Sequence, residues 1–237
     1  MTKLGILVAM AVECRSLTPK RVPQGGCLEL DQHCLIGLSG AGPAAADRCV
    51  DLLVNAGAKS LISWGCAAAL APGIHPGDLI LPDRIACIGG QLIDTDESWR
   101  KRLTAKLEGQ IHLYSGLLAE SDRIVARADE KQAIHAATGS IALDMESAAV
   151  ARAAERHRMP FLAIRSIVDP VDVTLPPSIE GAFDDKGMLH VRKMLLSAFL
   201  HPVDFIDIVR LGRHFDAAMK TLKLAADMGR DTNFAVA

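Results

Sequence analysis

The chain has 237 residues, half of them hydrophobic, with a formal net charge of -2 and a pI of about 6.4. This length and composition predict one α/β domain with a sizeable buried core. The near-neutral charge and the lack of a basic patch argue against nucleic acid as a partner. No run of about eighteen apolar residues could span a membrane. The apolar start is interrupted by Glu13 and Arg15, so we expect no signal peptide and a cytoplasmic protein.

The six cysteines indicate neither a metal site nor a disulfide framework. They all fall in the first part of the chain, within mostly apolar patterns, and none belongs to a CxxC pair. Buried, reduced thiols are the simplest explanation. We therefore expect no metal ion and no cofactor.

The first predicted elements surround a turn of small residues. Residues 4–10 form a continuous apolar run typical of a buried parallel strand. Two short strand-like runs at 27–30 and 34–38 predict a hairpin, and a helix is expected at 44–56. Between them lies SGAGP, whose Ser39, Gly40 and Gly42 could present backbone amides to an anion at the helix start. A tight strand-to-helix connection explains this weak motif about as well.

The next buried strand, 60–64, ends in Gly65, Cys66 and three alanines. Five small residues after a strand would leave room for a ligand beside it. Beyond them we expect a turn entering a strand at 76–82, a helix at 97–107, a strand at 112–119 and a helix at 129–137.

The most informative stretch is IALDMESAAVARAAERHRMPFLAIRSIVDPVD, residues 141–172. It predicts a strand at 141–143, a helix at 148–157 and a second strand at 161–164, which together form a βαβ unit. Because ligands bind in the crevice at the ends of parallel strands, Glu146, Arg165 and Asp169 are expected to converge there.

The three residues offer complementary chemistry. Glu146 in the first turn of a helix would be ionised and could accept hydrogen bonds from a sugar diol. Asp169 precedes Pro170, which favours extended geometry and a projecting proton donor. Arg165 suits an anion. The alternative is structural, with Glu146 as a helix-start acid and Arg165 and Asp169 as an ion pair.

The character of the chain changes after residue 174. A break at 175–177 and a loop at 181–187 precede two predicted helices at 188–200 and 202–228. The apolar face of the second helix would pack on the domain or a second subunit, or would contact a membrane surface or a lipid substrate. We expect one domain, with a core at 1–172, a loop and helical extension at 173–229 and a frayed tail at 230–237.

Several of these segments together resemble the purine nucleoside phosphorylase superfamily, in the branch of the 5′-methylthioadenosine/S-adenosylhomocysteine nucleosidases. The matching segments, found in the family's order between residues 4 and 172, are LGILVAMAVE, LSGAGPAAA, SWGCAAALAPGIHPGDLIL, LDMESAAVA and RSIVDPVD. DPVDVTLPPS and the helical tail that follows are most similar to the hopanoid-associated phosphorylases.

The resemblance implies a three-layer αβα sandwich around a central mixed β-sheet, with C-terminal helices, assembled as a homo-oligomer. It implies cleavage of a purine N-glycosidic bond, with Asp169 as the general acid that protonates N7 of adenine. Asp169 would need to stay protonated above its reference pKa of about 3.9, which burial can achieve. Glu13 matches the general base that binds the attacking water, and Arg165 matches a residue near the nucleophile.

The same resemblance implies the substrate-binding residues. Glu146 matches the residue that holds the ribose 2′- and 3′-hydroxyls, and Met145 the residue that packs against the sugar. The other substrate-binding positions are Gly65, Cys66, Ala67 and Ile124.

Two departures from the family pattern leave the nucleophile open. Cys66 stands where a serine is usual, and a thiol is a weak donor. Val168 replaces another common serine. Glu13 favours water, whereas Arg165 and the amides of residues 39–42 favour phosphate as a co-substrate.

The leading hypothesis is an enzyme that releases adenine from adenosylhopane in hopanoid biosynthesis, by phosphorolysis or hydrolysis. The alternatives are a methylthioadenosine/S-adenosylhomocysteine nucleosidase and a noncatalytic nucleoside-binding protein.

Overall fold

The structure is a computed structural model that describes residues 3–175, 204–230 and 234. Its centre is β4 (Ser60–Ala69), which pairs in parallel with β1 (Leu4–Val8) and β11 (Phe161–Asp169) and antiparallel with β10 (Ala142–Asp144). The other strands are β2 (Gly26–Asp31), β3 (Cys34–Leu38), β5 (Leu79–Ile80), β6 (Arg84–Ala86), β7 (Leu92–Asp94), β8 (Leu113–Tyr114) and β9 (Leu117–Glu120). They form one mixed sheet in the order β2-β3-β1-β4-β10-β9-β6-β7, and β11 joins β4 to β5 and β8.

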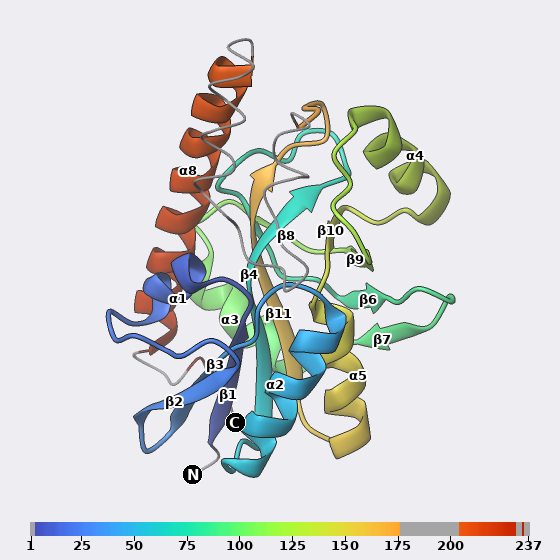
Figure 1. Ribbon diagram of the computed structural model, residues 1–237. Helices are drawn as coiled ribbons and strands as arrows, with labels where there is room; N and C mark the ends of the chain where they lie inside the picture. The colour runs from blue at the N-terminus through green and yellow to red at the C-terminus, as the bar shows by residue number, and fades with distance from the viewer. Residues whose placement is uncertain (1–2, 176–203, 231–233, 235–237) are drawn as a thin grey trace.

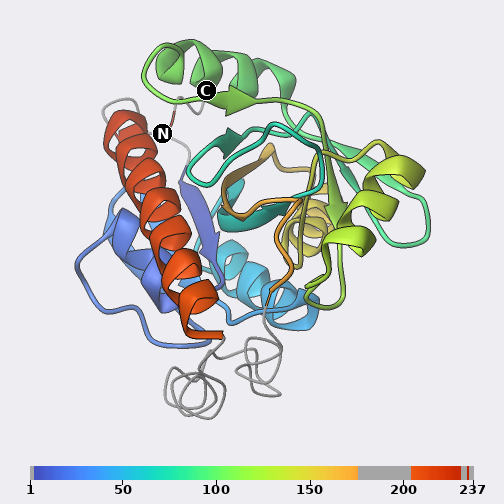
Figure 2. The same ribbon diagram turned by 90° about the horizontal axis from the view of Figure 1, so that it is seen from above.

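Helices cover both faces of this sheet (Figure 1). One face carries α2 (Pro43–Asn55) and α5 (Ser147–His157), and the other carries α1 (Ala11–Leu17), α3 (Glu97–Leu107) and α8 (Asp204–Arg230). Figure 2 shows α8 and α1 on one side of the molecule and the yellow-green α4 (Ala128–Thr138) on the other. The expected three-layer αβα sandwich with a central mixed sheet is confirmed.

The alternation of side chains along β1 explains why the sheet has two hydrophobic cores. Leu7 packs with α2 and α5, whereas Leu4, Ile6 and Val8 pack with α1, α3 and α8. Successive residues of a strand point to opposite faces, so a continuous apolar run needs a cover on both sides.

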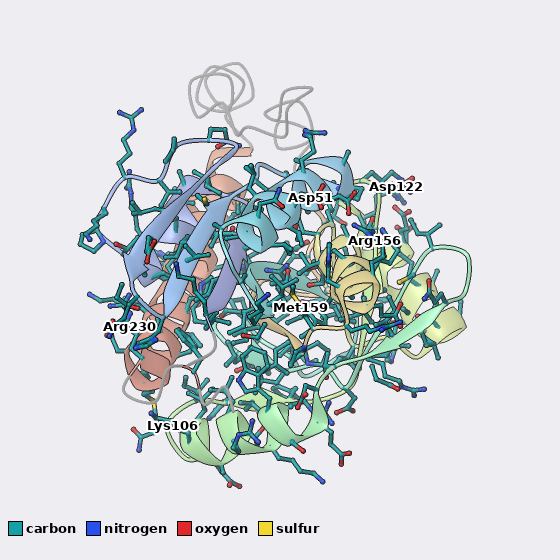
Figure 3. The ribbon with its side chains drawn as sticks, turned by 90° about the horizontal axis from the view of Figure 1, so that it is seen from below. Asp51, Lys106, Asp122, Arg156, Met159 and Arg230 are labelled. Carbon is teal, nitrogen blue, oxygen red and sulfur yellow. The ribbon has the colours of Figure 1, made fainter. Side chains whose placement is uncertain are left out.

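An ion pair joins the two helices on the first face. Arg156 of α5 lies 2.7 Å from Asp47 of α2. Figure 3 shows Arg156 near Asp51, which follows Asp47 by one turn, and it shows Met159 in the turn after α5. Met159 packs against the core on this face, so the turn that leads into β11 is anchored.

Most predicted elements appear within one or two residues of their expected bounds, but the strand at 112–119 is two strands. β8 pairs with β5, whereas β9 pairs with β6 and β10. The chain changes partner at Gly116, where a Cβ would lie 2.9 Å from Cδ1 of Ile141. The close approach of Ile141 therefore requires glycine at this change of direction.

The predicted parallel βαβ unit is wrong in one respect. β10 and β11 both pair with β4, but β10 runs antiparallel to it and β11 parallel. An apolar run of three residues carries no information on its direction, so the pattern could not reveal this. Both strands nevertheless pair with the last residues of β4, and Asp144 at the end of β10 accepts a hydrogen bond from Arg165 of β11.

The C-terminal helix packs on the domain, as expected. Leu222 and Ala226 of α8 are buried in the core that faces α1 and α3, whereas Val209 and Leu224 are about 40% exposed. Leu224 lies on the apolar face predicted from the sequence, and its exposure shows that this face is not covered along its whole length. Within residues 3–175 and 204–230, every helix is too short or too polar to cross a bilayer.

Phe234 is the one residue of the segment 231–237 that the structure describes. Its side chain is buried, its ring meets Trp64 edge-on at 5.9 Å, and its carbonyl accepts a hydrogen bond from Nε1 of Trp99. The break at 176–177, the loop at 181–187 and the helix at 188–200 lie outside the described residues.

Candidate active site

Glu13 lies in α1 and reaches the centre of the sheet. Its Oε2 accepts a hydrogen bond from the Met10 amide at 3.0 Å and its Oε1 one from the Cys66 amide at 2.8 Å. The short helix is anchored to β4 through Ser16, whose hydroxyl accepts from Nε1 of Trp64 at 2.9 Å. Burial raises the pKa of Glu13, and the charge of Arg165 opposes that rise.

Because Gly65 has no side chain, Glu13 and Arg165 can both approach the backbone of β4 at this position. A Cβ at Gly65 would lie 2.7 Å from Oε1 of Glu13 and 2.8 Å from Nη1 of Arg165. The expected end of the strand at residue 64 is wrong, because β4 continues to Ala69 with β11 and β10 as partners. The room beside the small residues is therefore filled, at least in part, by these two charged side chains.

Arg165 is held by residues that the sequence patterns did not single out. Its Nε donates to Oδ2 of Asp144 at 2.5 Å, and its Nη2 donates to the hydroxyls of Ser63 at 2.6 Å and Ser147 at 3.1 Å. The Ser147 hydroxyl also donates to Asp144 at 2.6 Å. All four side chains are buried. The one available signal was the position of Asp144 at a strand end, two residues before Glu146.

Glu146 precedes α5 and lies beside the start of α2. It occupies the N-cap position rather than the first turn, and its Oε1 accepts a hydrogen bond from the Gly42 amide at 2.8 Å. Burial and the neighbouring Asp144 raise the pKa of Glu146 to about 7, although Arg165 and the Gly42 amide act in the opposite direction. The balance of these effects works against the ionised form of Glu146 that the sequence predicted.

The turn predicted to bind an anion uses its amides within the chain. The Ser39 amide donates to the Val8 carbonyl at 2.9 Å, and the Gly40 amide to the Ala9 carbonyl at 3.1 Å. The Gly42 amide donates to Glu146. A phosphate bound to these three amides would have to replace existing hydrogen bonds.

Asp169 lies at the last position of β11, directly after an irregularity in the strand. The register with β4 shifts between Ile167 and Asp169, which leaves Val168 as an extra residue. Such a bulge re-aims the side chain that follows it. Burial raises the pKa of Asp169 to about 6, while the charge of Lys131 limits that rise.

Lys131 of α4 is the partner of Asp169, and sequence reasoning missed it. Its side chain is fully buried, and Nζ lies 2.7 Å from Oδ1 of Asp169. A lysine in a predominantly polar helix gives no sign of burial, so the sequence carried no signal for this contact.

The remaining predicted substrate residues line the same region in part. Ile124 is half-buried and packs with Ala126, Leu175 and Leu211 of α8. Met145, between Asp144 and Glu146, is half-buried, and Ala67 is buried in β4.

The thiol of Cys66 does not form a reactive centre. Burial and the charge of Glu13 raise its pKa well above the usual value, so it is a neutral thiol. All six cysteines are free. Among the described residues, no group of His, Cys, Asp and Glu side chains is arranged to hold a metal ion.

The structure thus brings Glu13, Arg165 and Glu146 into one buried cluster and sets Asp169 apart along β11. Asp169 is four positions after Arg165 in an extended strand, which corresponds to about 13 Å between Cα atoms. A ligand that extends along the end of the sheet could contact the cluster with one part and Asp169 with another.

Comparisons with known proteins bear on the family and the fold of the chain. The model of the phosphorylase superfamily matches residues 27–199. The 5′-methylthioadenosine/S-adenosylhomocysteine nucleosidase of Thermotoga maritima is 31% identical over 103 residues, 41% of this chain and 48% of that protein. The corresponding nucleosidase of Buchnera aphidicola is 26% identical over 160 residues, 60% of this chain and 64% of that protein. The chain therefore matches about half to just under two thirds of the length of these relatives.

Solved structures share the fold. The Helicobacter pylori 5′-methylthioadenosine/S-adenosylhomocysteine nucleosidase with butyl-thio-DADMe-Immucillin-A has a TM-score of 0.73 at 18% identity, over 100% of this chain and 99% of that chain. Futalosine hydrolase of the same organism has a TM-score of 0.71 at 18% identity, over 99% of this chain and 98% of that chain. Because the family model covers most of the sequence and the fold agrees with it, the chain is an enzyme of the phosphorylase superfamily.

Proposed function

We propose that this enzyme hydrolyses the N-glycosidic bond of a 5′-substituted adenosine and releases adenine. The observation that carries the proposal is the buried cluster in which one guanidinium, Arg165, faces the carboxyl groups of Asp144, Glu13 and Glu146. Asp169, a second buried acid, lies further along the same strand as Arg165.

The charge of the cluster favours water over phosphate as the nucleophile. One buried cation already faces three carboxyl groups, and a phosphate dianion would add further negative charge to a site of low dielectric. The amides of Ser39, Gly40 and Gly42, which a phosphate could use, donate within the chain. A neutral water molecule meets neither obstacle.

Each residue then has a role in the reaction. As the bond from C1′ to N9 breaks, positive charge develops on the ribose and negative charge on the purine. Glu146 and the ionised members of the cluster stabilise the first charge as preorganised electrostatics. Glu13 accepts a proton from the attacking water, and Asp169 donates a proton to N7 of the purine.

The relatives support methylthioadenosine or adenosylhomocysteine as the substrate more strongly than adenosylhopane. The curated proteins that match are named 5′-methylthioadenosine/S-adenosylhomocysteine nucleosidases. Much of the segment that suggested a hopanoid substrate follows residue 175 and lies outside the described residues. Adenosylhopane, a lipid or membrane contact, a homo-oligomer and a cytoplasmic location stay predictions.

A noncatalytic nucleoside-binding protein is less consistent with the site. Isolated buried carboxyl groups are costly unless they are paired or neutralised. A binding protein could recognise a nucleoside with neutral hydrogen-bonding groups and would not need Glu13, Glu146 and Asp169 buried together.

The test is adenine release from methylthioadenosine, adenosylhomocysteine and a lipophilic 5′-alkyl adenosine, each with and without phosphate, with identification of the sugar product. We expect phosphate-independent release and a free 5′-substituted ribose. A ribose 1-phosphate product that depends on phosphate would refute hydrolysis. A preference for the lipophilic compound would restore the hopanoid hypothesis, and binding without turnover would indicate a binding protein.

A further inference from the structure

Lys131 is fully buried and has a complete set of hydrogen-bond acceptors. Its Nζ donates to Oδ1 of Asp169 at 2.7 Å, to the carbonyl of Pro170 at 2.9 Å and to the carbonyl of Val173 at 2.7 Å. An ammonium group has three N–H donors, whereas a neutral amine has two. Three short contacts to three oxygens therefore indicate the charged form.

These contacts join α4 to the segment that carries Asp169. The two carbonyls belong to residues one and four positions after Asp169, so Lys131 fixes the turn as well as the carboxyl group. Because Oδ1 accepts from Lys131, the other oxygen, Oδ2, is the one that can carry a proton to a ligand.

We propose that Lys131 is a positioning residue for Asp169, which it orients through Oδ1 and whose carboxylate it stabilises once the proton on Oδ2 has moved to the purine. This inference rests on the proposed function. In the step itself, the O–H bond of Asp169 breaks and the N7–H bond forms. The electron pair of the bond from C1′ to N9 passes to the purine, and Asp169 is left as a carboxylate in contact with the ammonium of Lys131.

Two other titratable residues near Asp169, Asp172 and His214, do not take the place of Lys131. Asp172, in the segment after β11, raises the pKa of Asp169, but more weakly than burial does. His214 of α8 lies against the backbone of Val168, and burial, aided by Arg210, lowers its pKa. Lys131 is thus the cation in direct contact with the proposed acid.

The first experiment compares wild type with Lys131→Met and Lys131→Arg over a range of pH. We expect Lys131→Met to lower kcat for adenine release about 100-fold, since a misplaced catalytic group commonly costs that much. Without the ammonium the pKa of Asp169 should rise, so the loss of kcat/KM with increasing pH should move to higher pH. Lys131→Arg, which keeps the charge, should retain the wild-type pH dependence.

A control separates this effect from a loss of structure. Arg127→Met removes a cation at the N-terminal end of the same helix, where Arg127 is exposed and pairs with Asp129 at 2.6 Å. It should leave both kcat and the pH profile unchanged. If Lys131→Met does not fold, Lys131→Gln keeps two N–H donors without the charge and should show the same pH shift. An unshifted profile in the folded variants would overturn the proposal.

A double-mutant cycle tests whether Lys131 acts through Asp169. In an Asp169→Asn background, Lys131→Met should cause no further loss of kcat, because residues that act through one another are non-additive. A further 100-fold loss would show an independent, structural role.

A measurement without substrate distinguishes failure of this inference from failure of the proposed function. Carbon-13 NMR titration of the aspartate carboxyl groups, with Asp169→Asn for assignment, should show Asp169 titrating at higher pH in Lys131→Met than in wild type. An unchanged titration would reject the contact even if adenine is released. A shifted titration in a protein that releases no adenine would confirm the contact and reject the reaction.

Discussion

The two ends of the candidate site, around Arg165 and around Asp169, differ in the ratio of acidic to cationic groups. Around Arg165, one cation faces the carboxyl groups of Asp144, Glu13 and Glu146, so negative charge is in excess. Around Asp169, one carboxyl group meets one ammonium, and the charges balance once the acid has given up its proton. An excess of negative charge suits a ribose that becomes positive, whereas a balanced pair suits an acid that must give up a proton and become an anion.

The largest effect on activity is expected when the acid Asp169 alone is removed. Asp169→Asn should lower adenine release by about 1,000-fold, since general acid catalysis contributes on the order of 10² to 10⁴. Circular dichroism should change little, because the amide oxygen can still accept from Lys131. Asp94→Asn, at an exposed position of β7, is the control with wild-type activity. Near-normal turnover in Asp169→Asn would mean that the purine leaves without this acid.

A larger side chain at Gly65, in the end of the site around Arg165, should have the next largest effect on activity. A Cβ in Gly65→Ala would meet Oε1 of Glu13 at 2.7 Å and Nη1 of Arg165 at 2.8 Å. We expect kcat to fall about 100-fold as these groups move apart. Gly212→Ala in α8, where a Cβ meets no atom within 4 Å, should keep full activity. Equal activity in the two variants would show that the approach to Gly65 is unimportant.

Glu146→Gln tests the contribution of charge at the sugar. The amide oxygen can still accept from Gly42, so the fold should persist. Because the pKa of Glu146 is about 7, only part of the population loses a charge at neutral pH, and kcat/KM should fall about tenfold. Kinetics on the riboside and its 2′-deoxy analogue provide the measurement. If the variant still distinguishes the two substrates as wild type does, Glu146 does not hold the 2′-hydroxyl.

The pH dependence of kcat/KM in the wild-type protein tests the acid at one end of the site and the base at the other without any mutation. Asp169 must be protonated to act, and burial raises its pKa to about 6. The value of kcat/KM should therefore fall about tenfold per pH unit above that pKa. Protonation of Glu13, whose pKa is raised by burial, should reduce activity as the pH falls, which gives a bell-shaped curve. Asp169→Asn should lose the descending limb, and its persistence would assign that limb to another group.

The smallest effect on activity is expected far from both ends. Phe234→Ala should destabilise the protein by about 3 kcal/mol, as other deletions of buried aromatic side chains do. Adenine release by the folded fraction should be unchanged. Thermal melting and activity together provide the check, with the exposed Val209→Ala as the control. A large loss of kcat in folded Phe234→Ala would link this core to the site.

The sequence predicted those parts of the site that lie at strand ends in strongly apolar surroundings. Asp169 ends the strand that follows residue 160, and Glu13 comes soon after another buried run, so their positions were predictable, whereas Arg165 lies inside β11 and beyond the predicted strand end at residue 164. Lys131 was not, because burial of a polar helix depends on what packs over it. The direction of β10 and the ordered Phe234 depend equally on contacts between distant segments, which a local pattern does not contain.

The position of β4 at the centre of the sheet also affects when the site can form during synthesis of the chain. β4 receives β1 from the start of the chain and β11 from residues 161–169 on its other edge. Until β11 is in place, Glu13 lacks Arg165 as a neighbour, and Asp144 lacks one of its hydrogen-bond donors. During synthesis the acidic groups around β4 would stay open to water until most of the chain is available. A fragment that ends before β11 should therefore fail to form this site, whatever the stability of its individual helices.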